Sequence, residues 1–218
     1  MSLVIETERL VLRPLEVRDA SAIVRLIGNL AVSRWLTVVP HPYTLEDALE
    51  FIEHISGPWD RAITRDSEVI GVVGIKDSLG YWLGQPFWGH GYMREAAGAL
   101  VDTWFAFAPT AEHGPEGSPR PQAEAKRPPS RWQRASGTTG AAGRCPAVPP
   151  GGTDGEGALK PARLISGYFT SNTASANVLT RLGFTPDGSE MVHARALGCE
   201  MELQRMVLTR GRWEARHG

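Results

Sequence analysis

Apolar side chains in the first half of the chain recur at helix spacing in two stretches. From residue 19 to 30 they repeat every three or four positions, as one buried helix face requires. A second helix is predicted over residues 44–55, because Thr44 and Asp47 form a capping pair at its start and Ser56-Gly57-Pro58 ends it. Shorter apolar runs predict strands at residues 10–13, 59–64, 69–76 and 80–83.

The same pattern continues later in the chain. A helix is predicted over residues 91–107, a strand over 163–169, a helix over 172–182 and a last strand over 201–209. Strands that come first and then alternate with helices imply a mixed central sheet flanked by helices, in an α/β or α+β domain.

One internal segment, residues 108–162, differs from its flanks. It holds ten of the 16 prolines and nine of the 24 glycines, and its large apolar side chains are Trp132, Val148 and Leu159. Such a stretch buries too little surface to offset the entropy of ordering it. We therefore expect a single domain over residues 1–218 that is interrupted by a disordered insertion at 108–162.

Composition and charge give no reason to expect a nucleic acid or a membrane as the binding partner. The 218 residues are 42% hydrophobic with a formal net charge of −1, so nothing points to a nucleic acid or an anionic membrane. No apolar run is long enough to span a bilayer, and the acidic N-terminal stretch is unlike a signal peptide. Cys145 and Cys199 form neither a disulfide framework nor a zinc pattern. We expect a cytoplasmic protein without a metal, and both a monomer and a homodimer stay open.

The most informative stretch is residues 80–96, where a predicted strand leads through a loop into a helix. Gly89 and Gly91 let the backbone approach a ligand closely, and the first amides of the helix lack intrahelical partners. Together with the helix dipole, these amides favour a phosphate or pyrophosphate. A glycine turn that only connects strand to helix would have the same sequence. A P-loop is excluded because no Gly-Lys-Ser or Gly-Lys-Thr occurs, and Arg94 stands where a dinucleotide fingerprint has glycine.

The residues Trp88-Gly89-His90-Gly91-Tyr92, followed by Glu95-Ala96, resemble the acyl-CoA loop of GNAT acetyltransferases. The match is to the branch that acetylates N-termini of ribosomal proteins (RimJ/RimL type). Three further segments resemble that branch. They are the opening strand at residues 8–14, the stretch 171–184, which contains an Asn-x-x-Ser motif and a Gly-Phe pair, and the closing residues 208–213. The resemblance covers both flanks of the insertion but not the insertion itself.

This resemblance implies a sheet splayed open between the fourth and fifth predicted strands, with acetyl-CoA in the opening. The backbone near Trp82 and Leu83 would hold the acetyl carbonyl, and the amides of residues 89–93 would cradle the pyrophosphate. Asn172 would contact the pantetheine arm, although a plain helix N-cap is the alternative. The implied contacts with acetyl-CoA are Trp82, Leu83, Trp88, Gly89, His90, Gly91, Tyr92, Met93, Asn172 and Ser175.

The implied reaction is direct transfer of acetyl to an amine, either a protein N-terminus or a small molecule. Many family members use a tyrosine to assist the departing thiolate, but Leu179 occupies that position here. In the RimJ/RimL branch the serine of Asn-x-x-Ser can take this role, which points to Ser175; a small polar residue in the first helical turn is the alternative. For the base we predict Glu200, and Glu202, His193 and His41 are further candidates. A salt-bridged or solvated surface carboxylate, or for His41 a plain loop residue, is the alternative.

Two other interpretations stay open at this point. The missing tyrosine and uncertain base leave room for a GNAT-fold protein that binds acyl-CoA without turnover. The other interpretation is an enzyme whose activity is impaired by the insertion at residues 108–162. Tyr81, Trp82, Phe87 and Trp88 could form a stacking platform for bases, but a strand and loop packed on the core explain them better.

Overall fold

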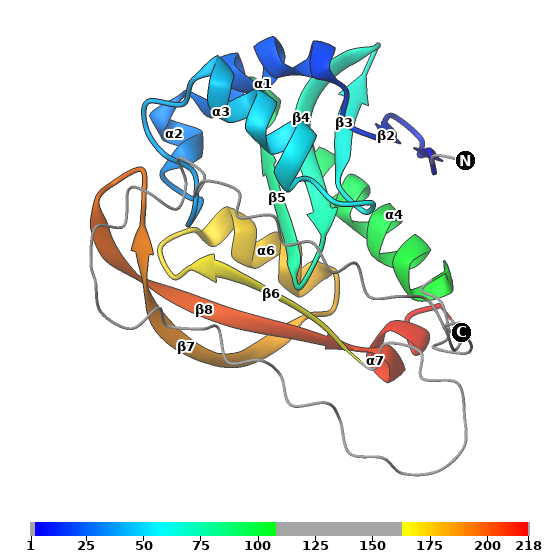
Figure 1. Ribbon diagram of the computed structural model, residues 1–218. Coiled ribbons are helices and arrows are strands. Elements are labelled where there is room, and N and C mark those ends of the chain that lie inside the picture. Colours follow the sequence, from blue (N-terminus) through cyan, green and yellow to red (C-terminus); the bar gives the residue numbers. More distant parts are fainter. Residues whose placement is uncertain (1–2, 108–162, 218) are drawn as a thin grey trace, which may run out of the picture. The chain divides into compact units, whose positions relative to one another are not determined.

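The computed structural model describes residues 3–107 and 163–217, so the predicted insertion at 108–162 lies outside the described residues. The described strands form one sheet of eight in the order β1-β2-β3-β4-β5-β6-β8-β7 (Figure 1). These strands are β1 (Ile5–Glu6), β2 (Val11–Arg13), β3 (Arg61–Arg65), β4 (Glu68–Ile75), β5 (Leu79–Leu83), β6 (Arg163–Phe169), β7 (Thr185–Ala194) and β8 (Cys199–Thr209).

The sheet consists of two antiparallel parts that meet at one parallel junction. Strands β1 to β5 pair antiparallel in sequence order, and β6, β8 and β7 form a second antiparallel group. Between the two groups, β5 and β6 run parallel and are joined by a single pair, Leu79 with Ser166. Beyond that pair the two strands separate, so the predicted splay between the fourth and fifth predicted strands is confirmed at β5 and β6.

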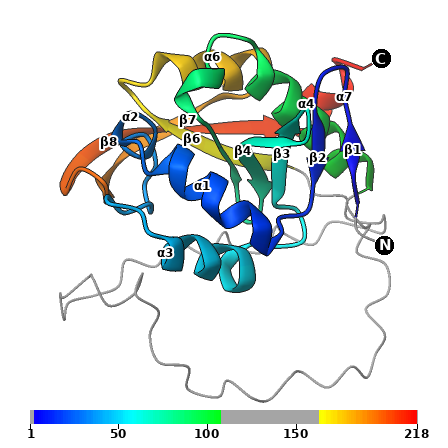
Figure 2. The same cartoon turned by 90° about the horizontal axis from the view of Figure 1, so that it is seen from above.

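Helices cover both faces of this sheet. In Figure 2, α1 (Ala20–Ile27) and α3 (Leu45–Glu50) lie on one face, while α4 (Tyr92–Phe107) and α6 (Thr173–Arg181) lie on the other. The short helices α2 (Leu30–Ser33) and α7 (Arg210–Glu214) complete the described α-helices. Two 3-10 helices, Val17–Asp19 and Gln85–Phe87, and a π-helical segment, Phe51–Ile55, are described as well. The mixed α/β class expected from the order of elements is therefore confirmed.

The main core lies between the sheet and α4. Leu100 and Phe105 of α4 are buried against the sheet, and Leu179 of α6 belongs to the same cluster. On the other face, α1 buries Ile23, Leu26 and Ile27 of the predicted apolar stripe together with Ala20, whereas Ala22 is half-buried and Leu30 is exposed. The core thus fixes α4 and α6 beside the splay, where the candidate site lies.

Two predicted helices are shorter than expected, for local reasons. The helix predicted over residues 19–30 ends at Ile27, because the Asn29 side chain accepts from the Ala31 amide and caps a new helix, α2. The capping pair of Thr44 and Asp47 is confirmed, but α3 changes into a π-helical segment at residues 51–55. The predicted strands and the other helices agree with the structure to within two residues.

The sequence pattern missed β7 altogether. This edge strand pairs with β8 alone, and most of its side chains are exposed, so it has no apolar alternation to detect. Its register shifts between Pro186 and Ser189, around Gly188 with φ +87°. Proline and a bulge are common devices on exposed edge strands. The short elements β1 and α7 were missed as well.

Within residues 3–107 and 163–217, no helix combines the length and apolar character needed to cross a membrane.

Candidate active site

A cleft of about 850 Å³ opens where β5 and β6 separate. Its walls come from β5, the loop and first turn of α4, β6, α6 and the segment after α2. Cavities of roughly 300–1,000 Å³ are the size that binds cofactors and other small molecules. All ten residues predicted to contact acetyl-CoA line this cleft. The fold therefore gathers them in one place, although they come from two segments far apart in the sequence.

A second hollow, of about 1000 Å³, lies along β2 and the β3–β4 turn. Much of its lining is already engaged in ion pairs, such as Arg13 with Asp19 at 2.7 Å. It includes Tyr92 but neither glycine of the loop. The cleft at the splay is therefore the better candidate for a phosphate-bearing ligand.

The loop before α4 has the backbone that a phosphate cradle needs. Gly89 and Gly91 have φ of +80° and +78°, a region that residues with a Cβ rarely adopt. A Cβ on Gly89 would meet nothing within 4 Å, so the backbone there is open to a ligand. Helix α4 begins at Tyr92, directly after the loop, and its first amides have no intrahelical acceptor. This geometry suits an anion such as pyrophosphate.

Glu95 of α4 anchors this loop to the N-terminal segment. Its carboxylate accepts from Thr7 Oγ1 at 2.6 Å and from the Arg9 amide and Arg9 Nε at 2.9 and 2.8 Å. Arg9 Nη1 in turn donates to the His90 carbonyl at 3.1 Å. Burial raises the pKa of Glu95, but the hydrogen bonds from Thr7 and Arg9 outweigh it and hold the pKa below its ordinary value. The glutamate of the motif therefore shapes the loop from outside the cleft.

Two guanidinium groups lie near the ring of Tyr92. Arg9 and Arg65 lie 4.8 and 5.3 Å from its centroid, and Arg65 Nη1 donates to the Tyr92 hydroxyl. The Tyr92 side chain is buried. The contact of Tyr92 with acetyl-CoA stays a prediction, and with the side chain buried it falls to the backbone amide; the ring contacts stabilise the start of α4.

Arg94 and Arg181 give the cleft its positive charge. Both line it, one from the first turn of α4 and one from the end of α6. Among the described lining residues there is no aspartate or glutamate. The sequence prediction did not include these arginines, because neither is among the motif residues from which the contacts with acetyl-CoA were inferred.

Alternation along β5 decides which backbone amide faces the splay. The Gly84 amide donates to Ile70 O at 2.9 Å, and the same register pairs Trp82 with Val72. Residues paired in this way exchange both backbone bonds, so the Trp82 amide is directed at β4. The Leu83 amide, one residue on, is directed at the splay. Leu83 therefore offers a backbone hydrogen-bond donor to the cleft. Trp82 lines the cleft, but its amide is directed at β4.

Trp88 is fixed to the end of β5. Its indole Nε1 donates to the Leu83 carbonyl at 2.8 Å, and its side chain stays 42% exposed. The bond joins the strand that offers the Leu83 amide to the loop that offers the glycines. The hydrogen bond thereby fixes the position of the glycine loop relative to the end of β5.

Asn172 and Ser175 open α6 on the opposite wall. The Asn172 side chain accepts from the Ser175 amide at 3.1 Å, so Asn172 is the N-cap of α6. Its contact with the pantetheine arm, which can coexist with that role, stays a prediction. Ser175 Oγ lies 2.8 Å from the hydroxyl of Tyr81 on β5. The sequence prediction assigned Tyr81 to packing, and no sequence signal links residues 94 positions apart.

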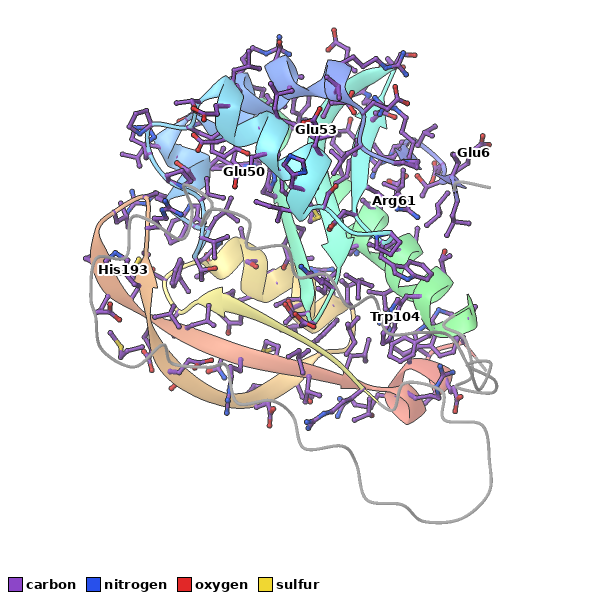
Figure 3. The ribbon with its side chains drawn as sticks, in the orientation of Figure 1. Glu6, Glu50, Glu53, Arg61, Trp104 and His193 are labelled. Atoms are coloured by element: carbon purple, nitrogen blue, oxygen red, sulfur yellow. The ribbon has the colours of Figure 1, made fainter. Side chains whose placement is uncertain are left out.

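The predicted base lies on the β7–β8 hairpin. Glu200 Oε1 is 3.2 Å from Nδ1 of His193, and both side chains are more than half exposed. Figure 3 labels His193 on this hairpin. Neither residue is among those that line the cleft, and Glu202 and His41 are not either. The role of Glu200 stays a prediction.

The described residues contain no group of three or more histidine, cysteine, aspartate or glutamate side chains that could hold a metal ion.

A family model described as an acetyltransferase (GNAT) domain matches residues 9–185, which is most of the chain. The chain belongs to the GNAT acetyltransferase family. The resemblance to this family drawn from the glycine loop is thereby confirmed. An uncharacterised N-acetyltransferase, p20 of Bacillus licheniformis, is 29% identical over 114 residues, which are 45% of this chain and 64% of the relative. The match thus spans less than two thirds of that relative.

Solved structures of GNAT proteins share the fold. A GNAT acetyltransferase from Bacillus anthracis superposes with a TM-score of 0.63 at 15% identity, covering 95% of this chain and 98% of that one. A ribosomal-protein-S5-alanine acetyltransferase from Vibrio fischeri gives 0.62 at 16% identity, covering 97% and 98%. RimL, a ribosomal L7/L12 α-N-protein acetyltransferase in complex with coenzyme A, gives 0.57 at 17% identity, covering 95% and 98%.

Proposed function

We propose that this protein transfers the acetyl group of acetyl-CoA directly to the nitrogen of an amine. The observation that carries the proposal is the cleft at the splay. There the positive-φ loop of Gly89 and Gly91, the start of α4 and the Leu83 amide of β5 face one cavity. RimL, which shares the fold, has been solved with coenzyme A. On this proposal the loop amides hold the pyrophosphate, and Arg94 and Arg181 neutralise phosphate charge.

The chemistry requires that the attacking nitrogen be neutral, because an ammonium has no lone pair. As the carbon–nitrogen bond forms, one proton leaves the nitrogen and negative charge develops on the carbonyl oxygen. The Leu83 amide is the donor proposed for that oxygen. The carbon–sulfur bond then breaks, and the thiolate takes up one proton to become the thiol of CoA. Ser175 is the hydroxyl proposed to donate a hydrogen bond to the departing sulfur.

The acceptor is proposed to carry a single amine on an apolar or aromatic body. The segment after α2 adds Trp35 and Leu36 to the cleft, and β8 adds Leu203. Because the described lining of the cleft contains no aspartate or glutamate, a substrate with several positive charges would find no carboxylate partner inside it. A protein N-terminus with an apolar neighbour fits this description, as does a small aromatic amine.

Glu200 stays the proposed base, acting through water. The Arg195 amide, in the turn of the β7–β8 hairpin, donates to the Thr37 carbonyl at 3.1 Å, and Thr37 lines the cleft. This bond brings the hairpin that carries Glu200 to the rim of the cleft. A carboxylate at the rim can accept a proton from the amine through one or more waters.

The test is turnover of acetyl-CoA over a panel of amines, followed by release of the CoA thiol and by the mass of the product. The panel should contain peptides with apolar and with basic residues after the N-terminus, aromatic amines, a polyamine and an aminoglycoside. We expect the highest kcat/KM for the apolar single amines. Binding of CoA in calorimetry without thiol release for any amine would instead favour an acyl-CoA-binding protein without turnover. Preference for the polyamine would overturn the proposed acceptor class.

A further inference from the structure

Tyr81 reaches across the splay to the residue proposed to assist the departing sulfur. It lies on β5, and Ser175 lies in the first turn of α6, so the two belong to opposite walls of the cleft. The Tyr81 hydroxyl is 2.8 Å from Ser175 Oγ and 3.4 Å from the Ser175 carbonyl oxygen. The shorter distance is a normal O–H···O hydrogen bond, and the longer one is outside the usual range. The hydroxyl pair is therefore the contact that matters.

The phenol keeps its proton. Burial raises the pKa of Tyr81 to about 12, although the hydrogen bond with Ser175 acts in the opposite direction. Near neutral pH the group is thus a neutral O–H that can donate. A serine hydroxyl has one proton and two acceptor lone pairs, so it can accept from the phenol and still donate elsewhere.

We propose that Tyr81 is a positioning residue, whose hydroxyl donates to Ser175 Oγ and so leaves the Ser175 proton free for the departing sulfur. This inference rests on the proposed function. In the opposite arrangement Ser175 would donate to the phenol, and its proton would be unavailable to the cleft. The two arrangements share the same heavy-atom distance but predict opposite effects when the phenol oxygen is removed.

A second hydrogen bond between the two halves of the sheet serves as a control for a purely structural role of the Tyr81–Ser175 bond. Ser166 Oγ of β6 donates to the Leu79 carbonyl of β5 at 2.8 Å, at the closed end of the splay. Ser166 does not line the cleft. Its bond has the same length as the Tyr81–Ser175 bond and also joins β5 to the other half of the sheet. Ser166→Ala therefore reports what loss of such a tie does by itself.

The experiment compares Tyr81→Phe, Ser175→Ala, the double variant and Ser166→Ala with the wild type, in kcat, KM for acetyl-CoA and thermal unfolding. We expect Tyr81→Phe to lower kcat about 10-fold, as loss of one hydrogen bond to a reacting group does, with KM for acetyl-CoA within about 2-fold. In the Ser175→Ala background the same change should have almost no effect, because the group it positions is gone. Ser166→Ala should lower the melting temperature without that fall in kcat.

An unchanged or higher kcat in Tyr81→Phe would overturn the inference, since it would mean that Ser175 donates to the phenol. Equal losses in the wild-type and Ser175→Ala backgrounds would also overturn it, because Tyr81 would then act independently of Ser175. A wild-type protein that binds CoA and transfers nothing would overturn the proposed function and this inference together. An active wild type with an unaffected Tyr81→Phe variant would overturn the inference alone.

Discussion

Replacing Gly91 by alanine tests whether the loop before α4 is the pyrophosphate site. Gly91 has φ +78°, where an L-residue brings its Cβ close to the following carbonyl oxygen. The added Cβ would lie 3.7 Å from Arg9 Nη2, an ordinary contact with the flexible end of a side chain. The perturbation is therefore backbone strain and not a clash with a neighbour.

The expected cost follows from that conformation. A residue with a Cβ held in the left-handed region costs about 1–2 kcal/mol relative to glycine. If the free loop relaxes and the strain is incurred on binding, CoA affinity falls by about 5- to 30-fold, at 1.4 kcal/mol per factor of ten. Any part of the strain that the free protein retains lowers the free energy of unfolding instead. The two losses together should reach about 1–2 kcal/mol. Gly91→Val, with a branched Cβ, should abolish binding.

The assay is calorimetric titration with CoA beside denaturant unfolding, with Gly98→Ala as the matched control. Gly98 lies inside α4, the helix that follows the loop. A Cβ added at Gly98 would lie 3.5 Å from Leu182 Cδ2, an ordinary contact. Alanine in a helix interior gains about 0.5–1 kcal/mol over glycine, so this control should be at least as stable as the wild type and bind CoA equally well. Unchanged affinity and stability in Gly91→Ala would refute the reasoning. Equal weakening in both variants would show that the effect is not specific to the loop.

Three further predictions concern single side chains. Ser175→Ala should lower kcat roughly 10²-fold with CoA affinity nearly unchanged, and a wild-type kcat would remove Ser175 from the mechanism. Glu200→Gln should lower kcat while KM for acetyl-CoA stays the same; an unaltered kcat would leave water as the proton acceptor. The folded-state pKa of Glu95 lies below the ordinary 4.5, so its stabilisation is present above that pH and is lost as pH falls through the folded value. Glu95→Gln should therefore cost about 1 kcal/mol of unfolding free energy at neutral pH, because solvent screens the exposed Arg9 partner, and should show a shallower loss in acid. Equal acid sensitivity of both proteins in urea titrations would contradict this.

The local elements could be predicted from the sequence, because neighbours along the chain determine them. The capping pair at Thr44, the apolar stripe of α1 and the strand–glycine–helix order around Gly89 and Gly91 all depend on residues within a few positions of one another. Dihedral preference, capping and periodicity act over that range. The loop and the family were therefore recognisable before any tertiary contact was known.

The missed edge strand shows where local signals end. β7 has exposed side chains on both faces, a proline and a bulge, so nothing in its sequence distinguishes it from a loop. It forms a strand because β8 supplies the hydrogen-bond partners for its backbone. Pairing of this kind depends on where another strand lies, and only the fold decides that.

The parts of the site that depend on distant partners were likewise decided by tertiary structure. The sequence alone determined the glycine loop, the serine at the start of α6 and the absence of the usual tyrosine at Leu179. Only the fold brought Tyr81 to Ser175, 94 positions away, and Arg9 to Glu95, 86 positions away. The physical reason is that a hydrogen bond between remote residues forms only after the sheet has placed both walls of the splay, and no local preference encodes that distance.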